Sequence, residues 1–461
     1  MRTAFVAKDL TSSTLRSLNY TPEVEAFRRL SESRESVPLG TLLSRMGESY
    51  GKVFVRYDCA PELGEQLITQ GDMFAAEPDG RIIRGDALPR LEDHRVGRLD
   101  VLIAGAGTLG ETELFGRSII ADDRLVGRIV GPHAMKLAFT EPESDAALYS
   151  YAFLNTRVGI RAVRATGFGT KILGLRKDLL RSLPIPLPCG ATQHRVADLI
   201  RATVSGRERY VREINAARAC IEALPEMQEA TAMSRERRAR CVLWSGALPT
   251  LTAWTYGSAG ESLSLLSRRW SGRIRDVVGE NDIYRGGRYT RTRCQPPHGV
   301  DFFSQRDVFL VRPIPQRIVR PAVADRELLA PRRAIIAGGK GTLGEGELFG
   351  RCVFTGDDLA GHALTEDILR IRPSRSAETL YAFLSTLVGM RLLRSTAAGT
   401  KLLTCREDLV RKLPLPDLDS AAEERVTTQV RAAMSARAAA TAAEREAIRI
   451  VEEEVLPEWL A

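Results

Sequence analysis

Lysine, histidine and cysteine are scarce in this 461-residue chain, and the scarcity excludes several kinds of site. The seven cysteines form no Cys-x-x-Cys pair and the five histidines fall at no metal-ligand spacing. A disulfide framework and a zinc site are therefore both disfavoured. Because no apolar run reaches 18 residues and the N-terminal segment lacks a secretory apolar core, we expect a soluble cytoplasmic protein.

Arginine carries the positive charge of the chain. Only eight of the 66 basic residues are lysines, and the formal net charge is +8. Such usage can reflect nothing more than the base composition of the gene. It can equally reflect a surface that binds phosphates and base edges, for which the planar guanidinium group is suited. The charge permits nucleic-acid binding and leaves both explanations open.

The most informative feature is an internal repeat. Residues 102–117 read LIAGAGTLGETELFGR and residues 335–351 read IIAGGKGTLGEGELFGR, so that Gly107 recurs 234 residues later (107 to 341). The flanking segments recur in the same order: Gln70-Gly71-Asp72 as Gln305-Arg306-Asp307, Tyr151-Ala152-Phe153-Leu154 as Tyr381-Ala382-Phe383-Leu384, Gly169-Thr170-Lys171 as Gly399-Thr400-Lys401, and Leu183-Pro184-Ile185-Pro186 as Leu413-Pro414-Leu415-Pro416. The chain is therefore two copies of one unit.

Each copy is predicted to start with an irregular, mostly β region. Short apolar runs separated by Gly, Pro and Asp predict strands at 53–55, 73–75, 101–103 and 118–120, with basic strand-like segments at 81–84 and 317–320. A helix is expected over residues 144–163. A short helix or turn is expected over residues 175–182, before a proline run that ends it.

A long helix is predicted to close each copy. Residues 193–224 carry a coiled-coil seam with one basic defect, formed at two heptad positions by Ile200, Arg207, Ile214 and Ile221 and by Thr203, Tyr210, Ala217 and Leu224. The counterpart at 421–456 has a weaker seam of Val426, Val430, Met434, Ile448, Val451 and Val455. Because a lone helix with this much charge would be unusual, we expect the two helices to pair.

Both glycine turns fit the dinucleotide pattern G-x-G-x-x-G, starting at Gly105 and Gly339. That site requires a helix directly after the glycines, with its N-terminus at the phosphates. The residues after Gly110 instead include Gly116 and a strand-like segment, which favours a hairpin or bulge. We expect the glycines to supply turn conformations. No Walker loop, adenine-methyltransferase motif or nuclease motif is complete, and we therefore expect no enzyme activity.

The order of the segments in each copy resembles that in the specificity subunit of type I restriction–modification systems. The segments are a β-rich region, a Gly-Thr-Leu-Gly turn, a Tyr-Ala-Phe-Leu helix, a Gly-Thr-Lys segment, a Leu-Pro-x-Pro segment and a long helix. The resemblance spans essentially the whole chain. It departs from the family where a Glu-Gln pair usually opens the spacer helix, since this chain has Thr192-Gln193-His194 and Glu423-Glu424-Arg425.

The resemblance implies an α+β fold with two tandem, mostly β target-recognition domains, residues 1–188 and 233–416. A spacer helix would follow each domain, at residues 189–232 and 417–461, and the two helices would pair as an antiparallel coiled coil. Each domain would bind one half of a bipartite, asymmetric DNA target.

The same resemblance implies a non-catalytic phage-defence subunit whose partners are double-stranded DNA, two adenine methyltransferase subunits and, for restriction, a translocating subunit. S-adenosylmethionine, ATP and Mg²⁺ would belong to those partners, so that this chain would hold no cofactor and no metal and would contact no membrane. The alternative is a stand-alone DNA-binding or assembly protein without methyltransferase partners.

Candidate DNA contacts fall into two groups. The repeated Gly-Thr-Lys segments are expected to bind phosphate through Thr170, Lys171, Thr400 and Lys401, unless they are solvated turns. Arg176 and Arg406 would extend this phosphate site or form ion pairs with Asp178 and Asp408. Base contacts are expected where the copies differ most, in residues 40–60 and 275–295, through Arg56, Arg285, Arg288, Arg291 and Arg293, unless that basic segment is simply solvated.

Overall fold

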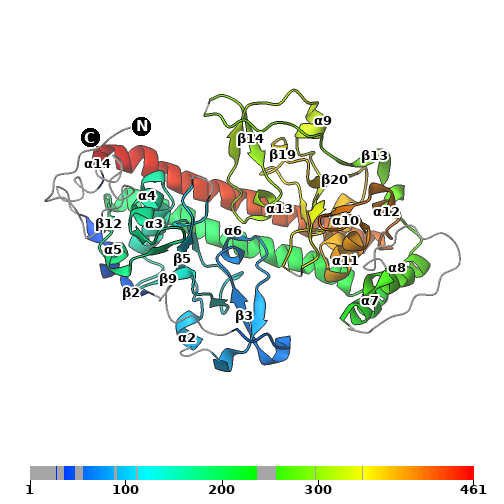
Figure 1. Ribbon diagram of the computed structural model, residues 1–461, viewed down its shortest axis with the longest axis horizontal. Helices are drawn as coiled ribbons and strands as arrows, with labels where there is room; N and C mark the ends of the chain where they lie inside the picture. The colour runs from blue at the N-terminus through cyan, green and yellow to red at the C-terminus, as the bar shows by residue number, and fades with distance from the viewer. Residues whose placement is uncertain are drawn as a thin grey trace. The chain divides into compact units, whose positions relative to one another are not determined.

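The computed structural model describes residues 27, 36–46, 56–87, 91–110, 113–235, 256–295, 297–344 and 346–460 (Figure 1). The chain divides into two compact units. Unit 1 consists of residues 1–208 and 439–461, and unit 2 consists of residues 209–438. Across the described ranges, no helix combines the length and the apolar character that crossing a bilayer requires.

Unit 1 is built on a four-stranded antiparallel sheet in the order β2-β9-β5-β7. Its strands are β2 (Leu43–Met46), β9 (Ala134–Phe139), β5 (Val101–Ala104) and β7 (Ser118–Ile120). Strands β5 and β7 are buried at every residue, as their unbroken apolar runs predict. Helices α3 (Asp145–Leu154) and α4 (Arg157–Ala165) follow the sheet in the chain, and their buried residues belong to the same hydrophobic core as those of the sheet.

Three smaller sheets complete unit 1. One has the order β4-β3-β8, with strands Arg81–Ile83, Glu65–Ile68 and Ile129–Val130. Another has the order β10-β11-β6, with strands Gly167–Phe168, Leu173–Leu175 and Ala106–Gly107. A third pairs β1 (Val37–Pro38) with β12 (Pro184–Ile185), and the short helix α5 (Lys177–Arg181) lies between β11 and β12 in the chain.

Unit 2 repeats the four-stranded sheet and both three-stranded sheets of unit 1, and the corresponding strands are neighbours in the same order. Its four-stranded sheet is β13-β20-β16-β18, formed by Val278–Arg285, Ile368–Pro373, Ile335–Gly338 and Cys352–Phe354. The three-stranded sheets are β15-β14-β19 (Gln316–Ile318, Val300–Phe303, Ala363–Leu364) and β17-β22-β21 (Lys340–Gly341, Leu403–Cys405, Ala397–Ala398). The sequence repeat is therefore a repeat of sheet topology.

The helices of unit 2 also correspond to those of unit 1, with two additions. Helices α10 (Ala377–Leu384), α11 (Leu387–Ser395) and α12 (Glu407–Val410) match α3, α4 and α5. Helices α7 (Pro225–Arg235) and α8 (Ser258–Arg269) pack on each other and on α11. Three further short helices are α2 (Leu91–His94) in unit 1, α9 (Asp325–Leu328) in unit 2 and α14 (Leu456–Leu460) in unit 1.

The two long helices are α6 (Gly190–Glu222) and α13 (Ser420–Ile450), and a π-helical turn at Val451–Val455 follows α13. They are antiparallel within unit 1, where Arg195 bonds Glu454 at 2.8 Å and Arg207 bonds Glu444 at 2.7 Å. They are antiparallel within unit 2 as well. There Arg437 lies 5.8 Å from the ring of Tyr210, and Cys220 bonds Gln429 at 3.7 Å.

Seven of the eight predicted heptad positions are buried, including the basic one, whereas Leu224 lies beyond the end of α6 and is half-buried. At most 2% of each residue is exposed at Ile200, Thr203, Arg207, Tyr210, Ile214, Ala217 and Ile221. On the second helix, Val426, Val430, Met434, Val451 and Val455 are buried, but the prediction for Ile448 is wrong. Ile448 is half-buried, and its neighbour Ala447 occupies the core instead.

The single helix predicted over 144–163 is wrong, because the chain forms two helices there. The Thr156 hydroxyl accepts a hydrogen bond from the Gly159 amide at 2.9 Å and caps α4. A Cβ atom at Gly159 would lie 2.0 Å from the Phe153 carbonyl oxygen, so the close junction requires glycine. Thr386 and Gly389 form the same junction in unit 2.

The β predictions are confirmed in part. Residues 101–103 and 118–120 are strands, and most of 81–84 and part of 317–320 are strands too. The strand predicted at 73–75 is wrong, because Asp72 accepts a hydrogen bond from the Thr69 amide at 2.7 Å and Asp72–Phe74 forms a 3₁₀ turn. The strand predicted at 53–55 lies outside the described residues.

Candidate nucleic-acid interface

One small sheet in each unit brings together two motifs that are distant in sequence. In unit 1, β6 of the Gly-Thr-Leu-Gly turn pairs with β11, and β11 pairs with β10 to form the hairpin that carries Gly169-Thr170-Lys171. In unit 2, β17, β22 and β21 pair in the same way around Gly399-Thr400-Lys401. We call this sheet with its turn and hairpin the turn–hairpin platform.

Side chains from elsewhere hold the platform of unit 1 at two points. The Gln70 side chain donates to the Ala106 carbonyl at 2.7 Å and accepts from the Ala106 amide at 3.0 Å. The Arg164 guanidinium donates to the carbonyls of Phe115 at 2.7 Å and Glu113 at 2.9 Å. The turn is therefore restrained on both sides by charged or amide side chains that a solvated loop would not need.

The platform of unit 2 has the same restraints. The Gln305 side chain bonds the Lys340 carbonyl at 2.9 Å and the Lys340 amide at 3.4 Å. The Arg394 guanidinium donates to Phe349 at 2.8 Å and to Glu347 at 2.9 Å. The two copies therefore share the hydrogen bonds around the turn as well as its amino-acid sequence.

The predicted structural role of the glycine turns is confirmed. Strand β7 is antiparallel to β5, and β18 is antiparallel to β16, whereas a dinucleotide site needs a parallel βαβ unit. The described residues 113–117 form no helix. Arg117 and Arg351 donate to the carbonyls of Glu113 and Glu347 at 3.1 and 3.2 Å, which places both in the turns themselves.

A pair of glycines in unit 1 tests how tightly the turn is packed. Gly116 and Gly127 both have a φ of +79°, but a Cβ atom at Gly116 would lie 2.7 Å from the Arg164 Cγ atom, whereas Gly127 has nothing within 4 Å. We expect Gly127→Ala to cost about 1–2 kcal/mol for the left-handed backbone alone. Gly116→Ala should cost about 1–3 kcal/mol more, because Arg164 must move. Urea unfolding of both variants measures the difference, and equal losses would contradict a packed turn.

The two repeated lysines occupy the tips of the hairpins. Thr170, Lys171, Thr400 and Lys401 are exposed, and neither lysine forms an ion pair with any residue in the described part of the chain. Gly169 and Gly399 precede them with φ values of +104° and +120°, a conformation that favours glycine. Each tip therefore presents an ammonium group that makes no ion pair with the described residues.

Arg176 and Arg406 form the ion pairs that were one of their two predicted roles. Each arginine precedes a short helix, α5 or α12, and bonds a carboxylate in its first turn, Asp178 or Asp408. Hydrogen bonds from these arginines hold the pKa of Asp178 and of Asp408 below the ordinary value for aspartate. A phosphate would have to compete with these carboxylates.

The arginine-rich segment of unit 2 divides into three environments. Arg285, at the end of β13, lies 3.7 Å from the Glu407 carboxylate, and Arg288 is exposed in the loop that follows. Arg291 bonds Glu366 at 2.6 Å. Arg293 forms an isolated bridge with Ile318. Of the predicted base-contacting residues, the structure thus brings Arg285 and Arg288 together, while Arg56 lies half-buried in unit 1.

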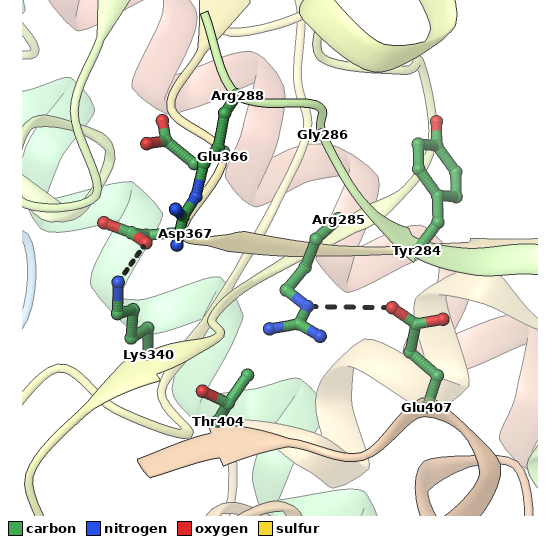
Figure 2. Close-up of a pocket in the computed structure, with 9 residues that line it drawn as sticks. All are labelled: Tyr284, Arg285, Gly286, Arg288, Lys340, Glu366, Asp367, Thr404 and Glu407. Atoms are coloured by element: carbon green, nitrogen blue, oxygen red, sulfur yellow. Dashed lines mark ion pairs between the residues drawn. The ribbon is translucent and has the colours of Figure 1, made fainter. Parts of the chain in front are cut away.

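Arg285 and Arg288 line an open cavity of about 430 Å³ in unit 2, which we call the charged pocket (Figure 2). Lys340 lies opposite and bonds Asp367 at 3.2 Å. The remaining lining residues are Tyr284, Gly286, Glu366, Thr404 and Glu407. The prediction from sequence missed Lys340 and the carboxylates. Lys340 could have been found from the sequence, because it replaces Ala106 inside an otherwise nearly identical repeat.

The Glu366 carboxyl in the charged pocket has a lowered pKa. Burial favours the neutral form of Glu366, but hydrogen bonds from its own backbone amide, Thr365 and Arg291 outweigh burial and lower its pKa. Beside the pocket, burial raises the pKa of Tyr289 to about 12, and its hydroxyl donates to the Leu364 carbonyl at 2.7 Å. Among the described residues, no group of three or more His, Cys, Asp or Glu side chains could hold a metal ion.

Comparison with known proteins gives no match to a family model and none to a curated protein sequence. Solved structures do match. The type I restriction–modification S subunit from M. genitalium is 11% identical, with a TM-score of 0.32 over 92% of this chain and 95% of that one. The HsdS subunit from Thermoanaerobacter tengcongensis is 15% identical, with a TM-score of 0.26 over 92% and 96%.

A third structure concerns the complex assembly and conformational transition of the type I R-M system. Its matching chain is 16% identical, with a TM-score of 0.27 over 92% of this chain and 97% of that one. The first two of these structures are S (HsdS) subunits, the kind of protein that the repeated motifs resemble, and each alignment covers 92% of this chain.

Proposed function

We propose that this protein is the specificity subunit of a type I restriction–modification system, a non-catalytic DNA reader with one recognition domain in each copy of the repeat. Each domain binds one half of a bipartite, asymmetric target. The observation that carries this proposal is the turn–hairpin platform, which occurs twice with the same restraints and the same exposed lysine.

The chemistry of the platform suits the DNA backbone. An unpaired ammonium group beside backbone amides in a glycine turn binds phosphate without regard to sequence. Because the two half-sites have the same backbone but different bases, the parts that bind phosphate can be identical in both copies. The parts that contact bases must differ, and Lys340 of the charged pocket corresponds to Ala106 in unit 1.

The long helices supply the proposed spacer. Their antiparallel contacts within each unit support pairing as a coiled coil, on which two adenine methyltransferase subunits would dock. S-adenosylmethionine, ATP and Mg²⁺ would be bound by the methyltransferase and translocating subunits.

Changing the helix length tests the spacer. Deleting one heptad from residues 193–224, with the facing heptad of α13, should shorten the gap between half-sites by about three base pairs. The deletion removes ~10.5 Å of helix, and one base pair occupies ~3.4 Å of duplex. Methylation mapping of the altered complex measures the gap. An unchanged gap would refute the spacer role.

The class of the protein is tested by a tagged pull-down from the source cells, with mass spectrometry of the bound proteins. The proposal expects an adenine methyltransferase at about two copies per chain and a methylated bipartite sequence in the genome. Recovery of the chain alone, with no methylated bipartite sequence, would overturn it in favour of a stand-alone DNA-binding or assembly protein.

A further inference from the structure

Several positions that line the charged pocket differ between the two units, whereas the restraints on the platform are shared. Sheet register defines the equivalent positions, because Lys340 faces Thr404 in unit 2 as Ala106 faces Gly174 in unit 1. Lys340 and Thr404 thus replace residues without a polar side chain. The pocket is built at the edge of the shared sheet by substitutions that leave the sheet unchanged.

Two acidic lining residues follow the same pattern. Asp367 accepts from the Gly339 amide through its carbonyl at 3.1 Å, as His133 does from Gly105 at 2.8 Å, so Asp367 replaces His133. Glu407 is the first residue of α12 as Lys177 is of α5, so a carboxylate replaces an ammonium group. The side chains at four lining positions therefore differ in chemistry between the two copies. At one of them, Glu407, the charge is reversed.

The balance of charges indicates the kind of ligand. Three cations face three carboxylates around the pocket: Arg285, Arg288 and Lys340, with Glu366, Asp367 and Glu407. A phosphate would meet as many carboxylates as cations, which disfavours it. A ligand that presents hydrogen-bond acceptors next to donors fits such a mixed surface.

The groups in the pocket are available to a ligand. Arg285 and Glu407 are 3.7 Å apart, beyond hydrogen-bond distance, and 37% and 39% of their side chains are exposed. Exposed ion pairs of this kind contribute little to stability and are readily exchanged. Arg288 is exposed, and within the described ranges it makes no ion pair (Figure 2).

We propose that the charged pocket of unit 2 reads a guanine–cytosine base pair, with Arg288 and Arg285 donating to the guanine O6 and N7 acceptors and Glu407 accepting the one cytosine amino hydrogen that base pairing leaves free. Guanine presents two adjacent acceptors, O6 and N7, in the major groove, which match an arginine fork, and cytosine presents an amino donor that matches a carboxylate. This assignment rests on the proposed function and names the residues that set specificity in the second half-site.

The test selects bound sequences from a pool of random DNA duplexes, using the full-length protein. The variants are Arg288→Ala and Glu407→Gln, and the control is Arg332→Ala, whose side chain is 81% exposed and lies outside the pocket. Each pocket variant should lose about 5- to 150-fold of its preference at one G·C position. The other half-site should keep its preference, which shows that the variant is folded, and the control should select the wild-type sequence.

The outcomes separate the two proposals. Wild-type protein that selects no sequence would overturn the proposed function itself. Wild-type selection of a bipartite sequence with both pocket variants unchanged would overturn only the assignment of the pocket. An equal loss of affinity for every sequence would also overturn it, because that pattern is expected of phosphate contacts.

Discussion

Replacing Glu444 with glutamine is expected to destabilise unit 1 by about 3–5 kcal/mol, because it leaves Arg207 buried without a counter-charge. The two groups are 2.7 Å apart, and their side chains are 3% and 0% exposed. Burial acts to lower the pKa of Arg207, but Glu444, Tyr151 and Asp122 outweigh burial and raise it. The guanidinium therefore stays charged in the core and depends on Glu444.

Urea unfolding followed by circular dichroism measures this loss. A matched control is Arg449→Met, which removes an exposed arginine of α13 that bonds Glu446 at 2.7 Å and should leave the unfolding midpoint almost unchanged. The double variant Arg207→Met/Glu444→Leu should recover most of the stability, since apolar residues of similar volume replace both charges. A midpoint unaffected by Glu444→Gln would show that Arg207 finds another partner or water.

The second large effect is expected on DNA affinity. The double variant Lys171→Ala/Lys401→Ala should bind every duplex about 10- to 50-fold more weakly at physiological salt, because each lysine releases counterions from one phosphate. The dependence of log K on log salt should become shallower by about 1.8, since each phosphate contributes ~0.9. Fluorescence anisotropy titrations over a range of salt concentrations measure both quantities.

The controls for this prediction are the single variants and Lys412→Ala. The single variants should each show about half of the change in slope, because the two hairpins are equivalent. Lys412→Ala removes the same charge from an exposed position outside the hairpins and should leave the slope unchanged. If the double variant kept the wild-type slope, the hairpin tips would be solvated turns, which is the alternative that the sequence left open.

Local patterns in the sequence predicted much of the scaffold. The strands at 101–103 and 118–120 and the short helix before the proline run depend on neighbouring residues, and the structure has them. The seam of α6 was also predictable, because a heptad pattern is a local property. The helix over 144–163 was predicted too long, since its apolar pattern continues across the capping residue Thr156.

The order of residues along short segments was enough to predict the repeat, several of its strands and helices, and the turn role of its glycines. Which distant groups meet depends on the folded chain. Arg207 looked like a defect in a seam until folding placed Glu444 beside it, 237 residues away. The charged pocket joins Arg288, Lys340, Asp367 and Glu407 from four segments. The register between strands and the register between the two long helices bring such groups together, and neither register can be read from spacing along the chain.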